Sequence, residues 1–133
     1  MYRKAYNFVL DILNDAQIND YIHDITGKHL AIINAGAQVS APSAQISFLG
    51  GRASRKDNTS AQILYSVDFW LPLWSNDAFS CCIDFVDFII PIFFDYRDGS
   101  SFILQIEPSI HEPDELLSQL WRVQFSLTLS IFL

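Results

Sequence analysis

The sequence predicts an α+β fold, namely a mainly antiparallel sheet with two principal helices packed against it and a long hairpin loop. Two segments have the period of amphipathic helices, and five have the composition or alternation of strands. The strands follow one another in neighbouring pairs, and helices interrupt this order twice. A length of 133 residues is typical of one domain, so we expect a single domain over residues 1–133.

The first predicted helix covers residues 2–16. Its apolar side chains share one face at helical period, and charged and amide side chains occupy the other face. The apolar side chains are Tyr2, Ala5, Tyr6, Val9, Ile12, Leu13 and Ala16. This pattern is typical of a helix that covers a core. Residues 19–28 are polar and are expected to form a turn-rich connection.

The next segments predict a hairpin with an oversized tip. Residues 29–34 are a short apolar run, and residues 44–49 alternate weakly, so both are expected to be strands. Residues 61–71 alternate clearly, and residues 50–60 between them have no apolar side chain larger than Ala53. One face of the third strand holds Ile63, Tyr65, Val67, Phe69 and Leu71. Small polar residues predict a mobile loop over 50–60.

The second predicted helix covers residues 77–96, after a helix-start signal at Ser75, Asn76 and Asp77. Its expected buried face consists of Phe79, Cys82, Val86, Ile89, Ile90 and Phe93. Pro91 is expected to kink or end the regular part of this helix, because proline lacks the N–H that the helix interior requires.

Two more strands are expected after Gly99. Residues 101–107 form the first, which we expect Pro108 to stop. A polar connection over residues 110–119 follows, with one helical turn at 113–117. Residues 121–133 then alternate strictly between apolar and polar side chains. Such a strand is roughly 43 Å long, which predicts that it extends past its own domain.

Composition favours self-association. The net charge is −7, which argues against general nucleic-acid binding because an acidic surface repels phosphate. Charged residues make up 17% of the chain and apolar residues 50%, so one monomer has difficulty burying its apolar surface. The alternative is a monomer covered by Ser, Asn, Gln and Thr.

Several features predict a cytoplasmic protein. The two cysteines, Cys81 and Cys82, are adjacent and imply no disulfide framework, which fits a reducing compartment. No signal peptide is expected, because polar residues interrupt the N-terminal segment. The most apolar stretch, residues 85–94, is about half the length of a membrane span.

No segment carries a recognisable catalytic or cofactor motif. His111, Glu112 and Asp114 could hold a metal ion, but a solvated acidic loop explains them as well. Asp84 and Asp87 could act as paired catalytic carboxylates, but nothing else marks them as a site. Cys82 is expected to face the core. We therefore expect no enzyme activity, no cofactor and no metal.

Two groups of charges are candidate interface residues. Arg52, Arg55 and Lys56 place three of the eight basic residues on one loop. Five aspartates of the second helix fall within about 80° of one another at 100° per residue. They are Asp77, Asp84, Asp87, Asp95 and Asp98. These aspartates are either a solvated face or a surface that docks on a basic neighbour, such as the loop of another copy.

The element order resembles that of the tail terminator proteins of long-tailed phages, including those of Mu-like prophages. The resemblance covers the helix at 2–16, the hairpin at 44–71, the helix at 77–96 and the strand pair at 101–133. It implies a six-fold ring that caps the tail tube, stops its polymerisation and contacts the head connector. The location would be the host cytoplasm and the virion tail.

The chain departs from the family in its acidic balance, its apolar segment at 85–94 and its long polar link at 110–119. Two rival functions remain open. A small-molecule or protein binding module would need polar groups that converge on one strand face, and the sequence suggests few. A degenerate enzyme would need a cluster of titratable side chains with perturbed pKa values.

Overall fold

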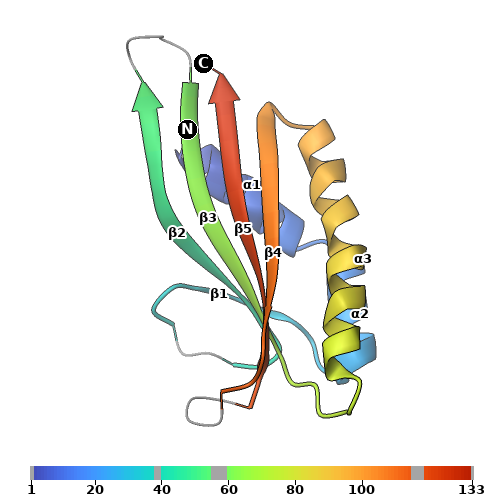
Figure 1. Cartoon of the computed structure of the whole chain (residues 1–133). Coiled ribbons are helices and arrows are strands. Elements are labelled where there is room, and N and C mark those ends of the chain that lie inside the picture. Colours follow the sequence, from blue (N-terminus) through green and yellow to red (C-terminus); the bar gives the residue numbers. More distant parts are fainter. Residues whose placement is uncertain (1, 38–39, 55–59, 115–118, 133) are drawn as a thin grey trace.

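The structure is a computed structural model that describes residues 2–37, 40–54, 60–114 and 119–132 (Figure 1). Its elements are α1 (Tyr2–Leu13), α2 (Ala16–Thr26), β1 (Ala31–Asn34), β2 (Ser43–Ser54), β3 (Ser60–Leu71), α3 (Ala78–Asp98), β4 (Phe102–His111) and β5 (Trp121–Phe132). The five strands form one sheet in the order β1-β2-β3-β5-β4. Only the β1–β2 pair is parallel among these neighbours. The predicted α+β fold is confirmed, with three helices.

Alternate side chains of the central strands form the core. Ile63, Tyr65, Val67, Phe69 and Leu71 are all buried, as the alternation of β3 predicts. The Phe69 ring meets the Phe85 ring of α3 edge to face at 4.9 Å between centroids. On the same face, the Phe8 ring of α1 lies 5.3 Å from that of Phe102 in β4. Helices α1 and α3 therefore pack on the same face of the sheet (Figure 1).

Helix α2 corrects the expected turn-rich connection at 19–28. Asp15 caps its first turn by accepting a hydrogen bond from the Gln17 N–H at 2.8 Å. Gly27 ends the helix in the left-handed region, at φ 76°, and its N–H donates to the His23 carbonyl. Two side chains, Ile18 and Ile22, are fully buried. The helix forms because its two buried isoleucines and both caps stabilise it, although most of its residues are polar.

Strands β2 and β4 are longer than expected. β2 continues through Gly50 and Gly51 to Ser54, with a register shift between Phe48 and Gly50. Part of the expected loop at 50–60 is therefore strand, and residues 55–59 lie outside the described residues. β4 continues past Pro108 to His111, because an edge strand has a side that needs no N–H donor.

The structure also corrects the predictions for β5 and α3. β5 pairs along its whole length with β3 and lies between β3 and β4, so the expectation that it extends past its domain is wrong. α3 continues through Pro91 to Asp98, and Phe79 is 52% exposed, not buried. The helical turn expected at 113–117 falls mostly on residues 115–118, outside the described residues. None of the described helices is long and apolar enough to cross a membrane.

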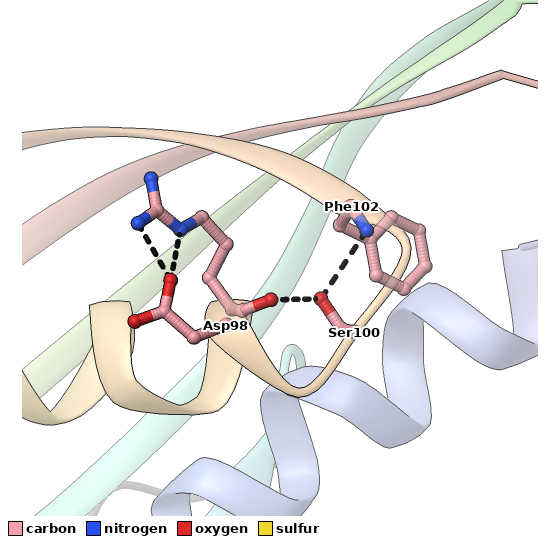
Figure 2. A network of polar contacts seen from close by, with 4 residues as sticks. Asp98, Ser100 and Phe102 are labelled. Carbon is pink, nitrogen blue, oxygen red and sulfur yellow. Dashed lines mark hydrogen bonds and ion pairs between the residues drawn. The ribbon is translucent and has the colours of Figure 1, made fainter.

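The turn from α3 into β4 is held by local hydrogen bonds (Figure 2). The Ser100 hydroxyl donates to the Arg97 carbonyl at 2.9 Å and accepts from the Phe102 N–H at 3.2 Å. Arg97 also pairs with Asp98 at 2.7 Å, on the exposed end of the helix. Ser100 thus satisfies a carbonyl at the helix end and the first N–H of the strand. The turn fixes where β4 starts beside α3.

We expect Tyr96→Phe to lower the free energy of unfolding by about 1 kcal/mol. The Tyr96 hydroxyl donates to the Asp15 carboxylate at 2.8 Å and thereby ties α3 to the start of α2. This hydrogen bond is the main reason why the pKa of Tyr96 is raised to about 12. Urea unfolding at neutral pH measures the loss. Tyr21→Phe is the matched control, and an equal loss in both variants would contradict the prediction.

Candidate functional sites

A surface of aromatic side chains lies where α1 meets the outer edge of β2. We call it the β2-edge surface and define it by Tyr2, Arg3, Tyr6 and Phe48. Tyr2 and Phe48 are 42% and 55% exposed, and their rings meet edge to face at 6.0 Å. The Arg3 guanidinium lies 5.6 Å from the Tyr6 ring centroid. Large exposed rings beside a cation are typical of an interaction surface.

Gly51 makes room for the Tyr2 ring in this surface. A Cβ atom at Gly51 would lie 2.8 Å from Tyr2 Cε1, closer than van der Waals contact permits. The exposed ring of Tyr2 therefore rests directly on the backbone of β2. Gly51, one of two glycines that suggested a loop in the sequence, instead allows an aromatic side chain to lie against the strand.

A second apolar surface lies at the opposite edge of the sheet, between α3 and β4. It is a groove of about 360 Å³, which we call the α3–β4 groove. Its lining residues are Phe79, Ile83, Val86, Asp87, Pro108, Ser109 and Ile110. Phe79 and Ile83 are 52% and 43% exposed. The β2-edge surface and this groove together hold four of the eight large apolar side chains that are exposed among the described residues.

The predicted interface charges that the structure describes lie on α3 and β2. Asp84, Asp87 and Asp95 are exposed on α3, and Asp87 lines the α3–β4 groove. Arg52 is exposed on β2, whereas Arg55 and Lys56 lie outside the described residues. The structure therefore puts the acidic candidates at one edge of the sheet and the described basic candidate near the other.

The sequence-based metal candidates were His111, Glu112 and Asp114. Among the described residues, no three His, Cys, Asp or Glu side chains are grouped closely enough to hold an ion. His111 is the last residue of β4 and contacts Ser109 and Gln124, so the expectation of a loop there is wrong. Cys82 is fully buried, and burial raises the pKa of its thiol to about 11. This thiol is unsuited to nucleophilic chemistry, as the sequence predicted.

A polar cluster occupies the sheet face that does not pack on α1 and α3. Gln124 on β5 donates to the Ser66 hydroxyl of β3 at 3.0 Å, and its carbonyl oxygen lies 3.3 Å from His111 Nε2 on β4. The Trp70 indole donates to Gln45 at 3.3 Å. These contacts link four neighbouring strands from β2 to β4. The sequence alone suggested few such groups.

Asp68 lies at the centre of this cluster. It is 7% exposed, and its Oδ1 atom is buried without a hydrogen-bond partner among the described residues. Burial raises the pKa of this carboxyl above the ordinary aspartate value of 3.8. Nearby polar and charged groups lower the pKa of Asp68 but do not cancel the rise caused by burial. These groups are Arg122, His111, Gln124 and Ser66. A buried carboxyl with an unsatisfied oxygen is costly for folding, which is typical of functional positions.

A pocket of about 610 Å³ opens beside the cluster. Its lining includes Trp70, His111, Glu112, Asp114 and Arg122. The Arg122 guanidinium lies 5.5 Å from the Trp70 ring centroid, so the two side chains stack at its wall. The pocket therefore combines an aromatic wall with charged groups of both signs.

This cluster is not apparent from the sequence, because its members come from four strands. The available signal was Asp68 itself, which is the one charged residue of β3. Register across β3 and β5 then places Gln124 directly opposite Asp68. Only the sheet order could reveal that neighbour.

No protein-family model matches the chain, and no curated protein matches it either.

The difference in unfolding free energy between Asp68→Asn and the wild type should shift in favour of the variant from pH 4 to pH 7. Because the folded-state pKa is raised above 3.8, the folded protein holds this proton more tightly than the unfolded chain does. Wild-type stability therefore falls as the pH rises through this interval, by up to about 1.4 kcal/mol for each unit of the shift. Asparagine does not titrate.

Urea unfolding of both proteins at pH 4, 5.5 and 7 measures this difference. Asp95→Asn is the control, because Asp95 is exposed on α3. A change in stability that is the same at all three pH values would show that burial of the charge is not the cause.

Proposed function

We propose that this chain is a structural assembly protein that forms a ring with copies of itself. The proposal is carried by one observation, the pair of exposed apolar surfaces at opposite edges of the sheet. Phe48 at one edge and Phe79 at the other are each more than half exposed. Exposed side chains of this size are usually buried by a partner. Only 17% of the residues are charged, so few charges oppose contact between the apolar surfaces of two copies.

The resemblance to phage tail terminators gives the ring a role. In this proposal a ring of six copies caps the tail tube, stops its polymerisation and joins it to the head connector. The protein acts by binding and has no catalytic step or cofactor. It works in the host cytoplasm and in the virion tail. The architecture is compatible with this role because helices on one sheet face leave both sheet edges available for neighbours.

Light scattering after size-exclusion chromatography tests the ring. We expect a mass close to six times the 15.2 kDa of one chain at micromolar concentration. Burying both apolar surfaces in every copy requires each copy to contact two neighbours, which gives a ring. The number of six copies follows from the resemblance to tail terminators. A mass of 15.2 kDa at all concentrations would rule out the proposal.

Capping is tested separately by adding the purified protein to a tail-tube protein encoded in the same genome while the tube polymerises. Tube lengths measured by electron microscopy should become shorter as more ring is added. Rings that form but leave tube growth unchanged would keep the assembly proposal and exclude the terminator role.

One observation favours a second function, a binding module that acts without catalysis. The pocket beside Trp70 and Arg122 adjoins a buried carboxyl with an unsatisfied oxygen, and pockets with convergent polar groups are typical ligand sites. In this alternative the protein is a monomer whose thermal stability rises when a small polar molecule binds. A thermal-shift screen, repeated with Arg122→Ala, separates this function from ring formation, because a true ligand should stabilise only the wild type.

A further inference from the structure

We infer that neighbouring copies join head to tail, with the β2-edge surface of one copy seated in the α3–β4 groove of the next. This inference rests on the proposed self-assembly and names the surfaces that carry it. The partner is thus a second copy of this chain, and each copy would use both surfaces at once.

The two surfaces differ in shape. At the β2 edge, the half-exposed rings of Tyr2 and Phe48 stand against each other beside Gly51. At the other edge, Ile83 and Pro108 belong to the wall of a recess. An exposed aromatic ring of one copy can therefore fill the apolar recess of another. Aromatic side chains seated in apolar pockets contribute much of the binding energy of protein interfaces.

The charges of the two surfaces are complementary. The β2-edge surface contains Arg3, whose guanidinium lies over the Tyr6 ring. The groove contains Asp87. Among the described residues, the only ion pair is Arg97–Asp98, so neither of these two side chains forms an ion pair within the described part of the chain.

The same charges argue against a symmetric contact. Pairing two grooves would place Asp87 of one copy near Asp87 of the other, and pairing two β2-edge surfaces would do the same for Arg3. Like charges brought together in an interface cost free energy. Contact between unlike surfaces instead brings aspartate to arginine. Charge therefore selects the head-to-tail arrangement over the isologous one.

The positions of the two surfaces also fit repeated use. β2 lies near one end of the strand order and β4 at the other end, so the surfaces are separated by the width of the sheet. A contact between unlike surfaces leaves one free surface at each end of a dimer. Addition of further copies continues until the last copy meets the first and the ring closes.

Two single variants and their mixture test the inference. Phe48→Asp blocks the β2-edge surface, and Ile83→Asp blocks the groove. Both side chains are substantially exposed, so the fold should tolerate either change, and circular dichroism checks this. We expect each variant alone to be monomeric, with association weakened about tenfold or more. Mixed in equal amounts, they should form a complex of two copies and no larger one.

The mixture is decisive because it contains one intact surface of each kind. The intact β2-edge surface of Ile83→Asp can meet the intact groove of Phe48→Asp, and the remaining two surfaces are both blocked. Ile103→Asp is the matched control, since Ile103 is 51% exposed on the face opposite the helices. This control variant should assemble like the wild type.

The outcomes distinguish the inference from the proposed function. A wild-type protein that is monomeric overturns both. A wild-type ring that survives Phe48→Asp or Ile83→Asp overturns the inference and leaves the ring intact. Variants that are monomeric alone and also monomeric when mixed overturn it too, because the intact β2-edge surface of one variant would then fail to bind the intact groove of the other. A variant that dimerises alone would show that its intact surface contacts its own kind.

A charge exchange gives an independent check. Arg3→Glu and Asp87→Arg should each weaken assembly, and the double variant should recover most of it, because the two charges meet across the interface with their signs reversed. The losses in the single variants should diminish at high salt, which screens exposed charges. A double variant that assembles no better than either single variant would show that Arg3 and Asp87 do not meet.

Discussion

The pairing of β3 with β5 is the constraint on which the rest of the structure depends. The two strands pair in one register from Ser60 opposite Phe132 to Leu71 opposite Trp121. Because side chains alternate in a strand, this register assigns every residue of both strands to one of two faces. A slip of one residue would exchange the phenylalanine core for the polar cluster. The helices can pack only after this assignment is made.

The helices cover one face of the sheet but do not cover its edges completely. Tyr2, the first residue of α1, is exposed beside β2. Phe79 and Ile83 of α3 are exposed beside β4. A domain of this size cannot bury all its apolar side chains in its own core. The exposed remainder is not scattered evenly, because part of it gathers at opposite edges beside charges of opposite sign. That distribution is the physical basis of the proposed head-to-tail assembly.

The polar face has a different physical character. Its side chains satisfy one another in a network across four strands, and Asp68 remains incompletely satisfied within it. Such a buried carboxyl lowers stability at neutral pH, so the fold retains it at a cost. The proposed ring would be built through the sheet edges and would leave this polar face uncovered.

The sequence by itself determined the elements whose periodicity is strong. One face of β3 and one face of β5 are apolar throughout, so the burial of that face followed from side-chain spacing alone. In the first helix the spacing correctly predicted the buried Ala5, Val9, Ile12 and Leu13, but Tyr2 is 42% exposed and Ala16 belongs to α2. Local patterns failed where a tertiary neighbour supplied the missing partner. Pro108 does not stop β4, because its outer side needs no donor, and Gly51 does not make a loop, because Tyr2 packs on it. Only the tertiary structure could bring Asp68 to Gln124 and His111, or place Phe48 and Ile83 at opposite edges, because strand order is not encoded in the spacing of any one segment.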